Sequence, residues 1–137
     1  MRVLMLTPWY PDERSPNSGI FIQSQATALS EGHDVVVISA KVDYKKFGLF
    51  SYQVDESKNG LVKEHRLLIC KSLPVYNQLN HLFITCLFTW RVARKWKPEI
   101  IHASIGFPGA FWGWVISKLV GVPFVFTEHT RITNNFR

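Results

Sequence analysis

Short apolar runs alternate with longer amphipathic stretches along this chain. Residues 2–7 form an apolar run that ends before Pro8, and residues 35–38 form a run of β-branched residues. Continuous runs of this kind are typical of strands that are buried on both faces. Between them the pattern predicts a helix over residues 20–31, ended by Gly32 in a left-handed conformation. A strand, a helix and a second strand in this order predict a parallel sheet.

The second half of the chain continues this alternation. Residues 41–59 are polar and weakly patterned, and Asn59-Gly60 predicts a turn. The pattern then predicts a strand, a long helix, a strand, a turn, a helix and a last strand, over residues 61–70, 78–96, 99–103, 106–109, 111–120 and 123–127. Gly121 is expected to end the last helix. We therefore predict one open α/β sheet of the Rossmann type, with no linker dividing it.

The long predicted helix carries an apolar stripe and a basic end. Its apolar residues recur at the i, i+3, i+4 spacing of one helix face; they are Leu79, Leu82, Phe83, Cys86, Leu87 and Trp90. Its last turns hold Arg91, Arg94 and Lys95, and Lys97 follows, which suits the negative end of a helix dipole. Such a basic end is either simply solvated or in contact with anionic lipid, which the adjoining apolar face would favour.

Composition and charge narrow the class of protein. With 137 residues, of which 47% are hydrophobic, the chain fits one globular domain. The net charge is +6, and residues 41–97 alone hold eleven basic and four acidic residues. This balance leaves open nucleic acid, an anionic membrane face or a phosphorylated ligand, although no nucleic-acid motif is present. Two cysteines and no apolar run of membrane-spanning length indicate a cytoplasmic chain that can touch the inner membrane face without crossing it.

Candidate chemistry follows the strands, because open parallel sheets bind ligands outside the carboxyl ends of their strands. In the first such loop, Asn17, Ser18 and Gly19 precede a helix. A glycine there lets backbone amides approach an anion, or it simply starts the helix. The dinucleotide fingerprint and the P-loop are both missing.

Aromatic and histidine residues in these loops are the other candidates. Trp9 and Tyr10 either stack on a sugar or anchor the loop. His102 either faces the cleft or packs beneath it. His129, after Glu128 at the end of the last strand, could bind a hydroxyl or transfer a proton, or it could be held by a neighbouring carbonyl. The sequence contains no metal motif and no recognisable catalytic triad.

Several of these segments together resemble family 4 glycosyltransferases. The matching segments, in the family's order, are R-V-L-M-L-T-P-W-Y-P at residues 2–11, S-G-I-F-I at 18–22, G-H-D-V at 32–35, P-E-I-I-H-A at 98–103, G-F-P-G at 106–109 and G-V-P-F-V-F-T-E-H at 121–129. The resemblance implies the N-terminal, acceptor-side half of a GT-B fold, in which two Rossmann-like domains face each other. The donor-binding C-terminal domain is then absent from this chain of residues 1–137.

The resemblance also assigns roles to residues. Gly19, with Ser18 in place of the family's first glycine, would meet the donor diphosphate through its backbone, and His129 would be the catalytic residue near the transferred sugar. The acceptor-binding candidates are Trp9, Tyr10, Asn17, His102 and Glu128. A nucleotide-sugar is the expected co-substrate, with retention of configuration and with no metal or other cofactor. Many members of the family build cell-surface polysaccharides or glycolipids at the inner membrane face.

We therefore expect the acceptor-binding half of a retaining glycosyltransferase that acts on a glycan or glycolipid, and that transfers no sugar by itself. One alternative is a non-catalytic binding module that pairs with a separate donor domain. Another is a nucleotide-dependent oxidoreductase of the Rossmann type, against which the missing glycine fingerprint counts.

Overall fold

The computed structural model describes residues 1–8, 10–11, 20–48, 51–71, 76–104 and 106–127. In this part of the chain, strands and helices follow one another as the sequence pattern predicts for an α/β domain. They are β1 (Arg2–Thr7), α1 (Ile20–Leu29), β2 (Asp34–Phe47), β3 (Tyr52–Asn59), β4 (Val62–Lys71), α2 (Asn77–Trp96), β5 (Ile100–Ser104), α3 (Gly106–Val120) and β6 (Phe124–Thr127).

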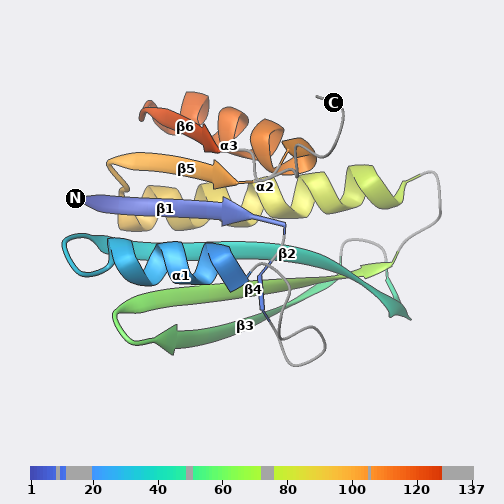
Figure 1. Ribbon diagram of the computed structural model, residues 1–137. Coiled ribbons are helices and arrows are strands. Elements are labelled where there is room, and N and C mark those ends of the chain that lie inside the picture. Colours follow the sequence, from blue (N-terminus) through green and yellow to red (C-terminus); the bar gives the residue numbers. More distant parts are fainter. Residues whose placement is uncertain (9, 12–19, 49–50, 72–75, 105, 128–137) are drawn as a thin grey trace, which may run out of the picture.

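One sheet contains all the described strands, in the order β3-β4-β2-β1-β5-β6 (Figure 1). The pairings β4–β2, β2–β1, β1–β5 and β5–β6 are parallel, as predicted. Only β3 runs antiparallel to its neighbour, because it forms a hairpin with β4. The sheet is therefore the expected Rossmann-like one, extended at one edge by the hairpin.

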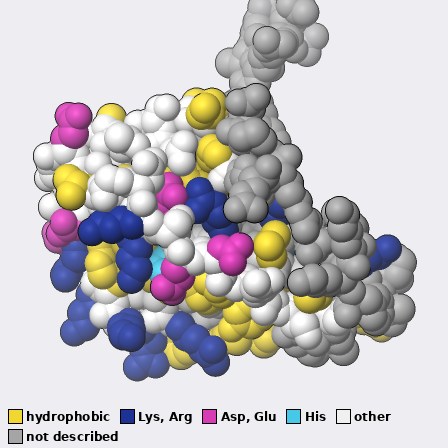
Figure 2. Space-filling model, turned by 90° about the horizontal axis from the view of Figure 1, so that it is seen from below, with side chains coloured by type: hydrophobic (Ala, Val, Ile, Leu, Met, Phe, Trp, Pro, Cys, Tyr) yellow, Lys and Arg dark blue, Asp and Glu magenta, His cyan; other side chains and the backbone are white. Residues whose placement is uncertain are grey.

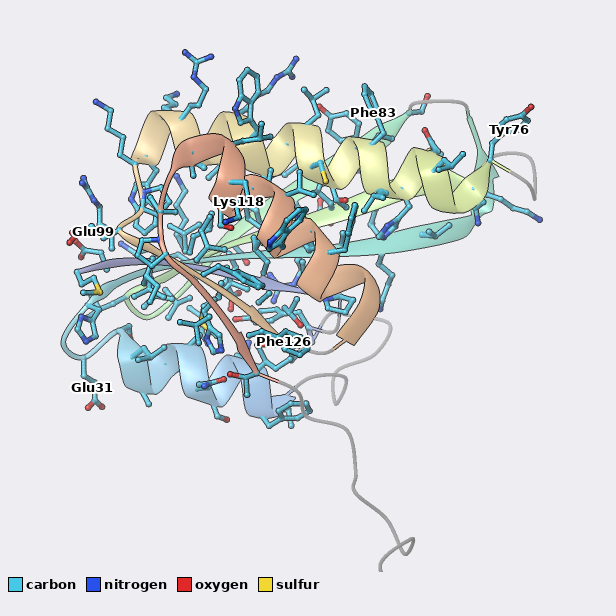
Figure 3. The ribbon with its side chains drawn as sticks, turned by 90° about the horizontal axis from the view of Figure 1, so that it is seen from above. Glu31, Tyr76, Phe83, Glu99, Lys118 and Phe126 are labelled. Carbon is cyan, nitrogen blue, oxygen red and sulfur yellow. The ribbon has the colours of Figure 1, made fainter. Side chains whose placement is uncertain are left out.

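Helices cover both faces of the sheet: α1 lies on one face, and α2 and α3 lie on the other (Figure 3). The larger core fills the space under α2 and α3, where Leu4, Ile38, Leu67, Ile101 and Trp112 are buried. A smaller core under α1 contains Val3, Met5, Ile22, Ala26 and Val37. Successive residues of a strand point to opposite faces. Each central strand therefore contributes to both cores, which explains the continuous apolar runs of the sequence.

The polar stretch of residues 41–59 is where the structure departs furthest from the sequence pattern. It forms the second half of β2 and all of β3, rather than the unpatterned segment expected. β3 lies at the sheet edge, and almost all of its residues are exposed. An edge strand with solvent on both faces needs no apolar alternation, and so it leaves no periodic signal. The turn predicted there is real, and Gly60 adopts a φ of 60° in it.

The helix ends match the predictions in part. Gly121 has a φ of 70°, and its N–H bonds the carbonyl of Ser117 at 2.9 Å, as expected of a glycine that ends a helix. The same prediction is wrong for Gly32, which has no positive φ; α1 ends at Leu29, whose carbonyl accepts from the N–H of His33 at 3.0 Å. The turn predicted over residues 106–109 is also wrong, because α3 already begins at Gly106.

The apolar stripe predicted on α2 is exposed at two of its residues, while Cys86 and Trp90 of the same stripe pack against the larger core. Leu79 is 63% exposed and Phe83 is 56% exposed, and Phe83 points away from the sheet (Figure 3). The side of α2 that faces the sheet instead buries Ile84, Thr89 and Ala93. The predicted stripe is therefore exposed at Leu79 and Phe83 and partly buried at its other residues.

A close approach between α3 and the sheet contributes to the larger core. Trp112 is buried, and its indole N–H donates to the hydroxyl of Thr89 on α2 at 2.7 Å. Next to it, a Cβ added at Gly113 would lie 2.6 Å from the Phe124 ring and 2.9 Å from Cβ of Ala103. The glycine therefore allows α3 to lie directly on β5 and β6.

Two further findings concern the membrane and the thiols. Among the described helices, none combines the length and the apolar character that crossing a bilayer requires. Cys70 and Cys86 are free, and burial raises the pKa of the Cys86 thiol.

Candidate functional site at the carboxyl ends of the strands

Polar side chains lie level with the carboxyl ends of β1, β5 and β6, on the face of the sheet that α1 occupies. Thr7 at the end of β1 is in register with Ser39 in the middle of β2, which is in register with Arg66 in the middle of β4. On the other side of β1, Ser104 of β5 is in register with Thr127 of β6. This edge is where open parallel sheets bind their ligands. The row of polar residues is therefore the candidate site in the described part of the chain.

His102 lies in this part of the sheet, beneath the strand ends. Its side chain is only 7% exposed, and Nε2 lies 2.7 Å from the hydroxyl of Thr127. Of the two placements open from the sequence, facing the cleft or packing beneath it, the structure has the second. Through this hydrogen bond His102 fixes the end of β6, the point from which the chain continues to Glu128 and His129.

Tyr10 is buried and belongs to the core under α1, with an exposed fraction of 3%. Its hydroxyl donates to Oε2 of Glu64 on β4, and the guanidinium of Arg66 lies 5.0 Å from the centre of its ring. Of the two roles considered for Tyr10, stacking on a sugar or anchoring the loop, these contacts favour the anchor. Burial, together with the hydrogen bond to Glu64, raises the pKa of Tyr10 above its usual range.

Glu64, which is buried, and Arg66, which is half-buried, form the centre of a polar network in the first half of β4. The carboxylate of Glu64 is almost completely buried and lies 3.1 Å from the Arg66 guanidinium. Arg66 donates through Nε to the carbonyl of Pro11 at 2.9 Å and through Nη1 to the hydroxyl of Ser57 at 2.6 Å. Gln23 of α1 donates to Glu64 at 3.5 Å. The network thus joins the segment after β1 to α1, β3 and β4.

Sequence reasoning missed this network. Glu64 and Arg66 stand two residues apart on one strand, so they share a face of it, and opposite charges at that spacing were the available signal. The signal is weak, because alternating charges on a strand more often face solvent. The hydrogen bonds to Tyr10 and Pro11 are made with residues more than 50 positions earlier in the chain.

One cavity lies at the candidate site, and a wider one lies near the opposite rim of the sheet. A small one of about 40 Å³ lies beside the network, and Pro8, Tyr10, Ser39 and Arg66 contribute to its walls. A wider one of about 590 Å³ lies near the opposite rim, where Asp34, Lys63 and Trp96 line it. Physical placement favours the first region for chemistry, because the wider hollow lies toward the amino ends of the strands. Within the described residues, no three His, Cys, Asp or Glu side chains are grouped so as to hold a metal ion.

Most of the predicted site residues lie outside the part that the structure describes. These are Trp9, Asn17, Ser18, Gly19, Glu128 and His129. At the carboxyl end of β5, the buried hydroxyl of Ser104 has no hydrogen-bond partner among the described residues. The structure therefore places the strands and anchors from which these segments start.

Comparison with known proteins identifies the family. A family profile described as Glycosyltransferase Family 4 matches residues 20–137. The chain belongs to glycosyltransferase family 4. This assignment confirms the resemblance seen in the sequence motifs, and the mostly parallel α/β sheet agrees with a Rossmann-like glycosyltransferase domain.

A relative of this family 4 chain is known from Bacillus subtilis (strain 168), under the name "Putative teichuronic acid biosynthesis glycosyltransferase TuaC". The two sequences are 24% identical over 148 aligned residues. The alignment covers 98% of this chain and 37% of the relative. The family 4 chain thus spans little more than a third of the length of the relative that it matches.

Proposed function

We propose that this chain is the acceptor-binding half of a retaining glycosyltransferase, which moves a sugar from a nucleotide-sugar to a glycan or glycolipid acceptor in cell-surface polysaccharide synthesis. The observation that carries the proposal is the family match over residues 20–137. The polar row level with the carboxyl end of β1 supports it, because this type of sheet binds ligands beyond the carboxyl ends of its strands. The name of the bacterial relative supports the choice of a cell-surface polymer.

In this proposal the described residues hold the reacting segments, and those segments meet the substrates. His102 fixes Thr127, after which Glu128 and the proposed catalytic His129 follow in the chain. Tyr10 and Arg66 hold the start of the segment that ends in Ser18 and Gly19, whose amides would meet the diphosphate. Transfer depends on support for the leaving diphosphate and on alignment of both substrates. We propose that a second domain supplies the remaining donor contacts, and that no metal takes part.

A radiolabelled nucleotide-sugar assay tests this proposal. The 137-residue chain alone is expected to transfer no sugar, whereas the same chain joined to the donor-binding domain of a family 4 relative is expected to transfer it to a membrane-extracted acceptor. His129→Ala should abolish transfer, and His33→Ala, which changes an exposed residue before β2, is the matched control. Turnover by the 137-residue chain alone would refute the proposed need for a second domain. Full activity of His129→Ala would refute the proposed catalytic residue.

We also propose that the face formed by α2 and α3 contacts an anionic membrane. Neither helix contains an acidic residue, while α2 ends with Arg91, Arg94 and Lys95, and α3 carries Lys118. The exposed Phe83 adds an apolar side chain to the same helical layer. Figure 2, which views the molecule from below and so from the side of β3 and β4, shows Lys and Arg side chains gathered in one corner with hydrophobic side chains between them, while α3 lies on the far side of this view. Basic residues beside apolar ones suit the surface of an anionic bilayer.

Vesicle sedimentation tests the membrane proposal. Binding to vesicles with 30% phosphatidylserine, a composition chosen as roughly that of an anionic leaflet, should exceed binding to neutral vesicles and should fall with salt. Arg91→Glu together with Arg94→Glu should remove it, whereas Lys71→Glu at the far end of β4 should not. Equal sedimentation with neutral vesicles, or equal loss in the Lys71→Glu control, would contradict a specific face.

A second candidate function is a non-catalytic module that pairs with a separate donor domain. Exposed apolar residues on the edge strand β6 favour it, since Val125 is 44% exposed and Phe126 is 40% exposed. Copurification of a second polypeptide with the tagged chain, and its loss on Val125→Lys, would support this reading. A titration with NAD(P) that gives no binding would remove the oxidoreductase alternative.

A further inference from the structure

The wide hollow of about 590 Å³ lies where the end of α2 meets the turn of the β3–β4 hairpin (Figure 1). Its floor is on the α2 face of the sheet, because Val36 packs into the larger core and Lys63 lies beside it in register. Trp96, the last residue of α2, forms a wall. Sites for small ligands have volumes of about 300–1,000 Å³, so the hollow is large enough for one. Exposed side chains of β2, β3 and β4 line it, so part of a longer molecule can also lie across it.

Two lysines lie directly opposite each other in this hollow. Lys58 of β3 is the register partner of Lys63 of β4, so the two residues share a face of the hairpin. Both are exposed, and neither forms an ion pair within the described part of the chain. Like charges directly opposite each other in an antiparallel pair are destabilising. An anion bound between the two ammonium groups would replace this repulsion by two charge-assisted hydrogen bonds.

Two carboxylates limit which anion fits the hollow. Glu56 is two residues before Lys58 on the same face of β3, and its Oε1 lies 3.4 Å from Nδ1 of His65. Asp34 lines the hollow from β2. Carboxylates accept hydrogen bonds from hydroxyl groups and repel further anionic groups. A ligand whose anionic groups are separated by hydroxyls therefore fits better than the closely spaced phosphates of a nucleic acid.

Trp96 supplies an aromatic surface that is already fixed. Its side chain is partly buried and packs against the larger core. The last turn of α2 is closed beside it, where the N–H of Lys97 donates to the carbonyl of Ala93 at 2.9 Å. A side chain held in this way loses little conformational entropy when a ligand stacks on it. The apolar face of a sugar ring is a ligand of this kind.

We propose that this hollow binds an acidic glycan, with a sugar ring stacked on Trp96 and a carboxylate or phosphate of the glycan between Lys58 and Lys63. The inference deepens the proposed function and rests on it for the role of the glycan, which is then the acceptor. The hollow lies toward the amino ends of the strands, whereas the candidate site lies level with the carboxyl end of β1. It therefore holds a part of the acceptor that is remote from the reacting sugar, and it favours long acidic acceptors over short ones.

Calorimetric titration of the 137-residue chain tests the inference without any need for transfer activity. The acidic probes are oligogalacturonate, which carries carboxylates, and a phosphorylated maltooligosaccharide; the tighter of the two shows which anion the lysines prefer. Binding of the acidic probes should weaken with salt, and an unmodified maltooligosaccharide of the same length should bind about tenfold more weakly. Lys58→Gln together with Lys63→Gln should weaken binding of the acidic probes by about tenfold, and Trp96→Phe by about threefold.

Lys71→Gln, which changes an exposed lysine at the other end of β4, is the matched control and should keep the wild-type affinity. Thermal unfolding without ligand checks that the variants are folded. Because the variant of Lys58 and Lys63 loses a like-charged pair, its Tm should equal or exceed that of the wild type.

No binding of either acidic probe, equal binding of the unmodified oligosaccharide, or full affinity in the variant of Lys58 and Lys63 would overturn the inference. Inorganic phosphate that binds as tightly as the acidic probes would overturn it too, because the hollow would then be a simple anion site. Binding to phosphatidylserine vesicles that this variant loses, without binding of the glycans, would indicate a lipid instead. If the acidic glycans bind but the radiolabelled assay gives no transfer, the proposed function fails and the glycan site stands.

Discussion

Substitution of Gly113 by alanine is the sharpest test of how α3 lies on the sheet. The new Cβ would lie 2.6 Å from Cε2 of Phe124 and 2.9 Å from Cβ of Ala103. Carbon atoms in favourable contact are about 3.5–4.0 Å apart, so both contacts are clashes. The Phe124 ring can turn away, but Cβ of Ala103 is fixed to the backbone of a central strand. Relief therefore requires α3 to move away from β5.

Two opposing effects set the size of the loss. Replacing glycine by alanine within a helix favours folding by about 1 kcal/mol. Overpacking of a tight core costs about 1–3 kcal/mol, and this site is at the upper end because one contact is with a backbone-fixed atom. We expect a net loss of about 1–2 kcal/mol in the free energy of unfolding, or a Tm lower by roughly 3–8 °C in a domain of this size.

Urea and thermal unfolding measure this loss. Phe124→Leu in the Gly113→Ala background should restore part of the stability, because it removes one of the two clashes and leaves the other. Gly32→Ala is the control, since nothing lies within 4 Å of its added Cβ and its φ is not positive, and it should change stability by less than about 0.5 kcal/mol. A Gly113→Ala protein as stable as the wild type would refute the close approach.

Three further predictions concern buried polar groups. Burial lowers the pKa values of His65 and His81, so the unfolded chain binds more protons than the folded chain below about pH 6.5. Tm should therefore fall as the pH drops from 7 to 5. In calorimetry, His81→Gln should make this fall in Tm less steep. Because the pKa of Tyr10 is raised, its contribution to stability is complete below about pH 10 and is lost only above it. Ultraviolet titration of the folded wild type should therefore show one tyrosine fewer ionising near pH 10 than the unfolded wild type, and Tyr10→Phe should remove this difference. Thr89→Val should lower the free energy of unfolding by about 1–3 kcal/mol in urea, because it leaves the Trp112 N–H unpaired. Trp112→Phe removes that N–H, so the loss in the double variant should be smaller than the sum of the two single losses.

The central strands could be predicted from the sequence, because a strand that is buried on both faces needs a continuous apolar run whichever elements pack against it. β1 has the predicted bounds, and β5 and β6 differ from the prediction by single residues at their ends. The edge strand β3 could not be predicted, since its partner β4 supplies the backbone hydrogen bonds and its side chains meet solvent. The start of α3 was hidden by Gly106, Pro108 and Gly109, which are typical of turns, although proline is well tolerated in the first turn of a helix.

For the candidate site, the location could be predicted from the sequence, but the role of each side chain could not. Its location followed from topology alone, because strand order and direction decide which loops meet at an edge. The role of each side chain did not, since a residue such as His102 has the same neighbours in sequence whether it points into a cleft or toward Thr127. The exposure of Leu79 and Phe83 in the stripe on α2 could not be predicted either, because periodicity defines a face of a helix without saying what covers it.

The two edges of the sheet differ in a way that bears on how the isolated chain behaves in solution. β3 presents Asp55, Glu56 and Lys58, and charged side chains of this kind discourage another strand from pairing with an edge. β6 is short and, within the described residues, presents no charge but exposes Val125 and Phe126. Aggregation of the purified chain should therefore begin at β6 rather than at the hairpin. A single lysine at residue 125 should raise its solubility more than any change on β3.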